Sequence, residues 1–176
     1  MSGLIHLYIG NGKGKTTAAV GLSVRAAGRD KQVLFAQFLK STATGEIPAL
    51  EKLGIRVVRS SQALGFTHQM NEETKAQCSQ EQGKILHTVL EALAQADGKA
   101  LDLVVLDEVL DALNTRMLAE DSLRSLITGR PPELELVLTG RNPPTWLVAV
   151  ADYVSEVTKI KHPYDRGIPA RIGIEC

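Results

Sequence analysis

A glycine-rich stretch near the start of the chain has the residue types needed to hold a row of phosphates. Gly10-Asn11-Gly12-Lys13-Gly14-Lys15-Thr16-Thr17 follows a short apolar run and precedes a helical pattern. In that context glycines let backbone amides surround phosphate oxygens at a helix N-terminus. Lys15 would contact the phosphates, and the Thr16 hydroxyl would bind Mg²⁺. The stretch therefore predicts a site for the phosphates of a nucleotide, most simply ATP.

The spacing of this loop differs by one place from the common phosphate-loop pattern. In G-x-x-x-x-G-K-[ST] the first glycine would fall at Ile9, whereas the chain has Gly10. A glycine-rich turn that only joins a strand to a helix is the alternative. Gly-Lys-Thr between a strand and a helix favours phosphate binding, so we interpret the stretch as a variant phosphate loop.

Two carboxylates end a second apolar run. Asp107 and Glu108 follow Leu103-Val104-Val105-Leu106. Open parallel sheets bind ligands at the carboxyl ends of their strands, so both carboxylates are expected beside the phosphate loop. An acidic residue in this place can also be a helix cap. Together with the phosphate loop, the pair predicts that Thr16, Asp107 and Glu108 serve Mg²⁺.

Further polar residues follow predicted strands. Arg141 comes after the run 134–138, and its forked donor set suits a phosphate. Asp111 is either a third acid near the site or, as we expect, a solvated helix residue. His162, before Pro163, is either a turn residue or a ligand contact. Three polar residues after another strand either line the site or order the loop: Gln37, Lys40 and Glu46.

Bringing these residues together requires a sheet. Predicted strands cover residues 4–9, 33–36, 55–58, 101–106, 134–138 and 153–160. Predicted helices cover residues 15–27, 48–54, 72–98, 121–127 and 146–151. Alternation of strands with crossover helices predicts an α/β protein with a mostly parallel central sheet covered on both faces. With the phosphate loop, this indicates a P-loop NTPase-like (RecA-like) three-layer fold.

The composition excludes several classes of protein. The chain has 176 residues, and 20 Lys+Arg balance 20 Asp+Glu, so we expect one domain (1–176) that binds neither nucleic acid nor an anionic membrane surface. No apolar run reaches the about 18 residues that a membrane span needs. Cys78 and Cys176 form no CxxC pair, which predicts neither a zinc site nor a disulfide framework and fits a cytoplasmic location.

The order of five motifs resembles the ATP:corrinoid adenosyltransferases of the CobA type. The first is the phosphate loop with its shifted glycine. The others are Phe35-Ala36-Gln37-Phe38-Leu39-Lys40 with Thr44-Gly45-Glu46, then Gly65-Phe66-Thr67, then Leu138-Thr139-Gly140-Arg141-Asn142-Pro143-Pro144, and the run from Ile160 to Glu175. The loop alone is unspecific, but the ordered set, which extends from about Gly3 to Glu175, is specific.

The resemblance implies an unusual use of a phosphate loop. Members of this family transfer the 5′-deoxyadenosyl group of ATP to the cobalt of a corrinoid. Co(I) attacks C5′, and triphosphate leaves. In the family ATP lies reversed along the loop compared with ordinary P-loop ATPases. Backbone amides, Lys15 and Mg²⁺ would stabilise the charge on the leaving triphosphate.

The same resemblance implies partners and a substrate class. The substrate would be cobalamin or a precursor corrinoid, in adenosylcobalamin biosynthesis or salvage. A reduced flavoprotein would donate the electron that makes Co(I), and the protein would be a homodimer. We expect the protein to bind neither nucleic acid nor a membrane.

The corrinoid residues implied by the resemblance are Phe66, Thr67 and His68. Family enzymes displace the lower axial ligand of cobalt with apolar side chains, and Phe66 matches one of them. His68 stands where the family has tryptophan. Imidazole is smaller and can itself bind cobalt. Either Phe66 acts with another hydrophobic residue, or this branch binds the corrinoid differently.

Other functions remain open from the phosphate site alone. A generic P-loop ATPase or small-molecule kinase explains the loop and Asp107-Glu108, but not Gly65–Thr67 or His162–Glu175, and it would release ADP. A non-catalytic nucleotide or corrinoid carrier would bind without turnover, and His68 favours it. Zero net charge argues against a nucleic-acid-stimulated ATPase.

Overall fold

The strands of the chain form one parallel sheet. The computed structural model describes residues 2–40, 43–60, 70–94 and 100–175. Within them the strands are β1 (Ile5–Ile9), β2 (Val33–Gln37), β3 (Arg56–Arg59), β4 (Leu103–Asp107), β5 (Glu135–Gly140) and β6 (Tyr153–Glu156). Their order is β3-β2-β4-β5-β1-β6, and every neighbouring pair is parallel. The expected α/β sheet is confirmed.

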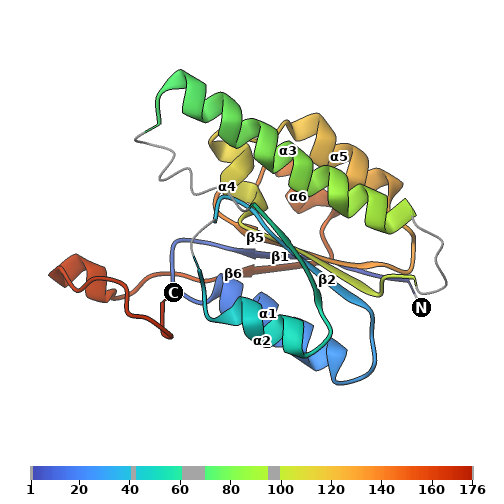
Figure 1. Ribbon diagram of the computed structural model, residues 1–176, viewed down its shortest axis with the longest axis horizontal. Helices are drawn as coiled ribbons and strands as arrows, with labels where there is room; N and C mark the ends of the chain where they lie inside the picture. Colours follow the sequence, from blue (N-terminus) through green and yellow to red (C-terminus); the bar gives the residue numbers. More distant parts are fainter. Residues whose placement is uncertain (1, 41–42, 61–69, 95–99, 176) are drawn as a thin grey trace.

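Helices cover both faces of this sheet, which gives the expected three layers (Figure 1). One face carries α1 (Lys15–Ala27) and α2 (Glu46–Lys52). The other face carries α3 (Glu72–Ala94), α4 (Val109–Asn114), α5 (Glu120–Gly129) and α6 (Thr145–Val150). A C-terminal segment with the short helix η2 (Pro163–Arg166) extends away from the sheet.

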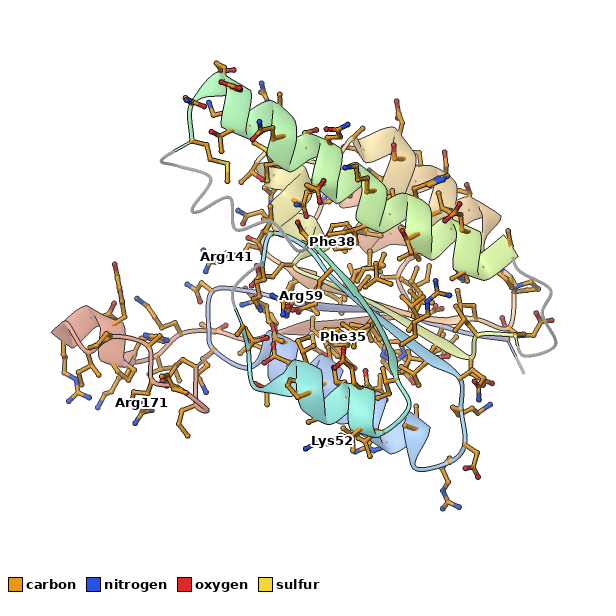
Figure 2. All side chains as sticks on the ribbon, viewed as in Figure 1. Phe35, Phe38, Lys52, Arg59, Arg141 and Arg171 are labelled. Atoms are coloured by element: carbon orange, nitrogen blue, oxygen red, sulfur yellow. The ribbon has the colours of Figure 1, made fainter. Side chains whose placement is uncertain are left out.

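The central strands are buried on both faces, which explains why their sequences do not alternate. All five residues of β2 and of β4 are buried. Leu34 and Phe38 belong to the apolar cluster under α3, whereas Phe35 belongs to the cluster under α1 and α2. Figure 2 shows Phe35 and Phe38 on opposite sides of the sheet. Crossover helices on both faces require such strands.

Parallel pairing brings the functional loops to one edge. Ile9 at the end of β1 pairs with Gly140 at the end of β5, and Gln37 at the end of β2 pairs with Asp107 at the end of β4. Each of these strands ends at or just before residues that the sequence analysis singled out as candidate site residues. The carboxyl edge of the sheet therefore carries the phosphate loop, the carboxylate pair and Arg141.

Several element bounds differ from the sequence expectations. Strand β6 ends at Glu156 rather than near residue 160, because Val157 turns toward the phosphate loop and its carbonyl accepts a hydrogen bond from Gly12 N, 2.7 Å away. Helix α2 begins at Glu46, ahead of Pro48. The sequence gives no bounds for helix α4, since six residues are too few to show a helical period. The expected end of the long helix near Gly98 lies outside the described residues.

The helices in the described ranges lack the features of membrane spans. None of them is both long and apolar enough to cross a bilayer.

Candidate nucleotide-binding cleft

A cleft of 1290 Å³ opens at the carboxyl edge of the sheet. The phosphate loop forms one side of it, and the C-terminal segment forms another. The sequence-predicted residues that line it are Asn11, Gly12, Lys13, Gly14, Lys15, Thr16, Thr17, Glu108 and Arg141. Two predicted residues do not line the cleft: Gly10, which is half-buried, and Asp107, which is fully buried. The structure thus brings the predicted phosphate and metal residues into one place.

The shifted first glycine of the loop has a steric reason. A Cβ at Gly10 would lie 2.4 Å from the Val157 carbonyl oxygen, and a Cβ at Gly12 would lie 2.8 Å from the same atom. Gly10 also has φ 109°, a conformation that side chains rarely adopt. Ile9, where the common pattern has its glycine, is still a strand residue paired with Gly140. The close approach of the chain after β6 therefore requires glycine at position 10.

Lys15 is held over the loop. Its ammonium donates to the Gly12 carbonyl oxygen at 2.9 Å, and the residue is half-buried. Burial lowers the pKa of Lys15, the charge of Arg141 lowers it further, and Asp111 opposes the shift. Arg141 follows β5, and Asn114 Nδ2 donates to its backbone carbonyl at 2.7 Å. Two cations thus face the same part of the cleft, which suits a polyanion.

Asp107 connects the phosphate loop to the centre of the sheet. This carboxylate is fully buried. Its Oδ1 accepts hydrogen bonds from Thr16 Oγ1 at 2.9 Å and from Thr139 Oγ1 at 2.7 Å. Its Oδ2 accepts from Gln37 Nε2 at 3.3 Å. Buried polar groups need such partners, so Asp107 fixes where the Thr16 hydroxyl lies.

Glu108 turns toward the cleft through an unusual backbone conformation. Its φ is 59°, and its N–H donates to Thr139 Oγ1 at 2.9 Å. Burial raises the pKa of Glu108, the charge of Lys40 opposes this shift, and Asp107 adds to it. Left-handed conformations of this kind gather at functional sites.

Lys40 and Asp111 line the cleft, although the sequence did not assign either of them to the site. Lys40 had been expected either to line the site or to order a loop, and it lines the cleft, with its ammonium 3.2 Å from Asp107 Oδ2. The position of Asp111 favours the alternative given for it, a third acid near the site. It lies on α4, but it is only partly exposed and lines the cleft. Burial raises the pKa of Asp111, whereas Arg141 and Lys15 oppose the shift.

The other three residues with open assignments lie at the cleft or directly behind it. Glu46 lines the cleft and accepts a hydrogen bond from Gln37 Nε2 at 3.1 Å, so Gln37 acts from behind the surface. His162 lines the cleft too, and its Nδ1 accepts from Tyr164 N at 3.2 Å. It is therefore a turn residue that also faces the cleft.

The oxygen atoms around Thr16 fit a hard divalent cation. Mg²⁺ in nucleotide enzymes takes one or two protein oxygens and completes its shell with phosphate and water. Thr16, Asp107 and Glu108 offer oxygens of this kind, and the Lys40 ammonium lies among them. Within the described part of the chain, no group of three or more His, Cys, Asp or Glu could hold a metal by itself. The arrangement thus suits a metal that arrives with phosphate.

The C-terminal segment forms the second wall of the cleft. It is joined to the loop by the Lys159 N–H, which donates to Asn11 Oδ1 at 2.8 Å. Figure 2 shows Arg141 and Arg171 at the same end of the molecule, although they come from distant parts of the chain. The segment lines the cleft with residues of mixed character: His162, Pro163, Tyr164, Ile168, Pro169, Ala170, Arg171, Gly173, Ile174 and Glu175.

The three residues expected at the corrinoid, Phe66, Thr67 and His68, lie outside the described residues. Their assignment stays a prediction from the resemblance.

Comparison with known proteins places the chain in a family. Residues 1–176 match the family described as ATP:corrinoid adenosyltransferase BtuR/CobO/CobP. The corrinoid adenosyltransferase of Escherichia coli (strain K12) is 35% identical over 98% of this chain and 85% of its own length. The corrinoid adenosyltransferase CobA of Salmonella typhimurium is 36% identical over 98% and 85%, and that of Pseudomonas aeruginosa 32% over 98% and 83%.

A solved structure supports the fold independently of close sequence similarity. ATPases 2 and 3 of EssC from Geobacillus thermodenitrificans superpose with a TM-score of 0.52 at 15% identity, over 98% of this chain and 36% of theirs. This likeness shows the fold alone. The whole-length family match and the 32–36% identities then settle the relationship. The chain belongs to the ATP:corrinoid adenosyltransferase family.

Proposed function

We propose that this protein transfers the 5′-deoxyadenosyl group of ATP to the Co(I) centre of a corrinoid and releases triphosphate. The observation that carries the proposal is the phosphate-loop cleft, with Lys15, Thr16 and buried Asp107, in a chain that belongs to this family over its whole length. The cleft of 1290 Å³ exceeds the about 300–1,000 Å³ of ordinary small-molecule sites, which leaves room beside a nucleotide for a second substrate.

In this reaction the negative charge that must be stabilised develops on the leaving group. The electron pair of Co(I) forms the Co–C5′ bond, the C5′–O bond breaks, and its electrons remain on the triphosphate. Amides of the loop from Gly10 to Thr17 would hold that negative charge together with Lys15 and Arg141, apart from the Gly12 amide, which donates to the Val157 carbonyl. Donors fixed before the reaction stabilise developing charge without the cost of reorganising solvent. This gives a phosphate loop a use that involves no phosphoryl transfer.

The metal is part of the proposal. Thr16 and Glu108 would contribute oxygens, and Asp107 would orient Thr16 or act through water. Bound Mg²⁺ would add positive charge at the phosphate oxygens. The nucleophile carries no proton, so none of the carboxylates has to act as a general base.

The remaining assignments come from the resemblance. Phe66, Thr67 and His68 would contact the corrinoid, which is cobalamin or a precursor. We also propose that a reduced flavoprotein supplies the electron and that the protein is a homodimer. Anaerobic turnover with Co(II) corrinoid and a reduced flavoprotein tests the donor, and light scattering tests the subunit number.

The deciding experiment mixes the protein anaerobically with MgATP and chemically reduced Co(I) corrinoid. We expect a light-sensitive adenosylcorrinoid in the visible spectrum and one triphosphate for each Co–C bond formed. ADP and phosphate without a Co–C product would instead assign the cleft to an ATPase or kinase. Binding of both substrates without any product would assign it to a carrier.

A further inference from the structure

The side chain of Lys40 lies in the middle of the oxygens that would serve the metal. Its ammonium is 3.1 Å from Glu108 Oε1, 3.2 Å from Asp107 Oδ2 and 3.4 Å from Thr16 Oγ1. An ammonium group has three N–H donors and no acceptor, so each of these oxygens has one donor available to it. The side chain is 26% exposed. Lys40 therefore occupies a preformed cation site, defined here as the oxygens of Thr16, Asp107 and Glu108.

The backbone aims Lys40 into this site at a conformational cost. Leu39, which precedes it, has φ 57°, a left-handed conformation that leucine rarely adopts. The turn is fixed on both sides: Leu39 N donates to Gln82 Oε1 at 2.9 Å, and Lys40 N donates to the Phe38 carbonyl at 2.7 Å. Phe38 N in turn donates to the Asp107 carbonyl at 2.9 Å. Strain held by surrounding contacts in this way is common at functional sites.

The charges explain why a cation is needed there. The Lys40 ammonium forms ion pairs with both the Asp107 and the Glu108 carboxylates, so one positive charge offsets two negative ones. Without a cation, two carboxylates would face each other in a partly buried place. Like charges at such short range repel strongly when water is excluded.

A free divalent ion and the Lys40 ammonium cannot use the same oxygens at once. We propose that Lys40 is a tethered cation that occupies the metal site while the cleft lacks nucleotide, and that it moves toward the phosphates when the metal enters with ATP. The inference rests on the proposed function only for the assignment of Thr16, Asp107 and Glu108 to the metal. It follows that the nucleotide-free protein binds a free divalent ion weakly and accepts one together with triphosphate.

The test measures Mn²⁺ binding to the nucleotide-free protein. The electron paramagnetic resonance signal of free Mn²⁺ reports how much of the ion remains unbound. We expect Lys40→Met to bind Mn²⁺ at least about tenfold more tightly than the wild type, because the competing charge is gone. Lys40→Gln removes the charge but keeps hydrogen-bond donors. It should show the same gain in Mn²⁺ affinity, and it replaces Lys40→Met in the test if that variant folds poorly. The matched control is Lys31→Met, which removes another lysine–carboxylate pair, with Asp102, and should stay within about twofold of wild type.

Two results would overturn the inference. One is Mn²⁺ affinity in both Lys40 variants no higher than in the wild type. The other is a gain in affinity that survives in Lys40→Gln/Glu108→Gln, because the ion would then bind elsewhere. This experiment uses neither ATP nor corrinoid. Failure of adenosyl transfer with a clear Mn²⁺ gain would therefore refute the proposed function alone, and the reverse outcome would refute only the role of Lys40.

Discussion

The two walls of the cleft are built in different ways. The phosphate-loop wall is defined here as residues 10–17 together with the carboxyl ends of β4 and β5. It depends on contacts between distant parts of the chain, such as the hydrogen bonds from Thr16 and Thr139 to the buried Asp107 carboxylate. The C-terminal wall, residues 162–175, depends largely on local contacts, such as the pair between Arg171 and Glu175. Ile172 in this wall is 94% exposed.

This difference separates two tasks. Charged groups that stabilise a leaving group must be fixed before the substrate arrives, and a packed sheet edge provides that rigidity. A wall with few buried contacts changes conformation at low cost and can adapt to a bulky second substrate. We therefore expect substitutions in the phosphate-loop wall to affect activity and stability strongly, and those in the C-terminal wall to act weakly.

The largest effect is expected from Lys15→Met. It removes a half-buried ammonium from the phosphate-loop wall, so kcat/KM for adenosyl transfer should fall at least about 100-fold. Lys161→Met removes the same charge beside the C-terminal wall, where the side chain is exposed, and should lower kcat/KM less than about threefold. Equal losses in the two variants would mean that the walls do not differ as described.

Stability should separate the walls in the same way. A Cβ at Gly140 would lie 2.6 Å from Leu110 Cβ and 2.8 Å from Asp111 Oδ2, at φ +143°. We expect Gly140→Ala to lower the free energy of unfolding in urea by about 2–3 kcal/mol. Gly167 has φ +74° and no atom within 4 Å of its Cβ position. Gly167→Ala should cost about 1 kcal/mol or less, and a cost as large as that of Gly140→Ala would contradict the comparison.

Asp111→Asn should have a smaller effect, and in the opposite direction. The Asp111 carboxylate faces Lys15 and Arg141, so it competes with a polyanion for the same charges. We expect calorimetry to show MgATP binding about threefold tighter in the variant. Asp165→Asn is the control, since Asp165 pairs with Lys159 in the exposed C-terminal segment, and it should leave MgATP binding unchanged. Weaker binding by Asp111→Asn would indicate that the carboxylate contacts the nucleotide favourably.

The smallest effect is expected at Glu175. Hydrogen bonds from the Arg171 side chain and backbone lower the pKa of Glu175 from 4.5 to about 2. A lowered carboxyl pKa means that the pair stabilises the segment fully above pH 4.5, and that this contribution disappears as the pH falls toward about 2. NMR titration of the carboxyl carbon should show this shift, while Glu175→Gln should leave the Tm at neutral pH almost unchanged. A large drop in Tm would show that the C-terminal wall is coupled to the core.

Local sequence was enough to predict the phosphate loop and most strands. Both motifs can be identified from neighbouring residues alone: Gly10 to Thr17 lies between a strand and a helix, and Asp107-Glu108 follows an apolar run. The parallel sheet then follows from the alternation of strands and helices, and it brings these segments to one edge. These parts of the site needed no knowledge of long-range contacts.

Lys40 and Asp111 could not be placed in this way. The position of Lys40 depends on the left-handed turn at Leu39. The sequence does not indicate this turn, because leucine rarely adopts a left-handed conformation. Asp111 lies on a helix of six residues, too short for a periodic pattern, and it reaches Arg141 because β4 and β5 are neighbours. Both depend on tertiary contacts, as does the early end of β6 beside Gly12.

The central claim is that the phosphate loop holds a leaving group rather than transferring a phosphoryl group. The most direct test uses ATP labelled with ¹⁸O at the 5′ oxygen, mixed anaerobically with the protein, Mg²⁺ and Co(I) corrinoid, with mass spectrometry of the products. Breakage of the C5′–O bond predicts that all of the label appears in triphosphate. Label retained in ADP or in an adenosine-containing product, with unlabelled phosphate released, would contradict the account.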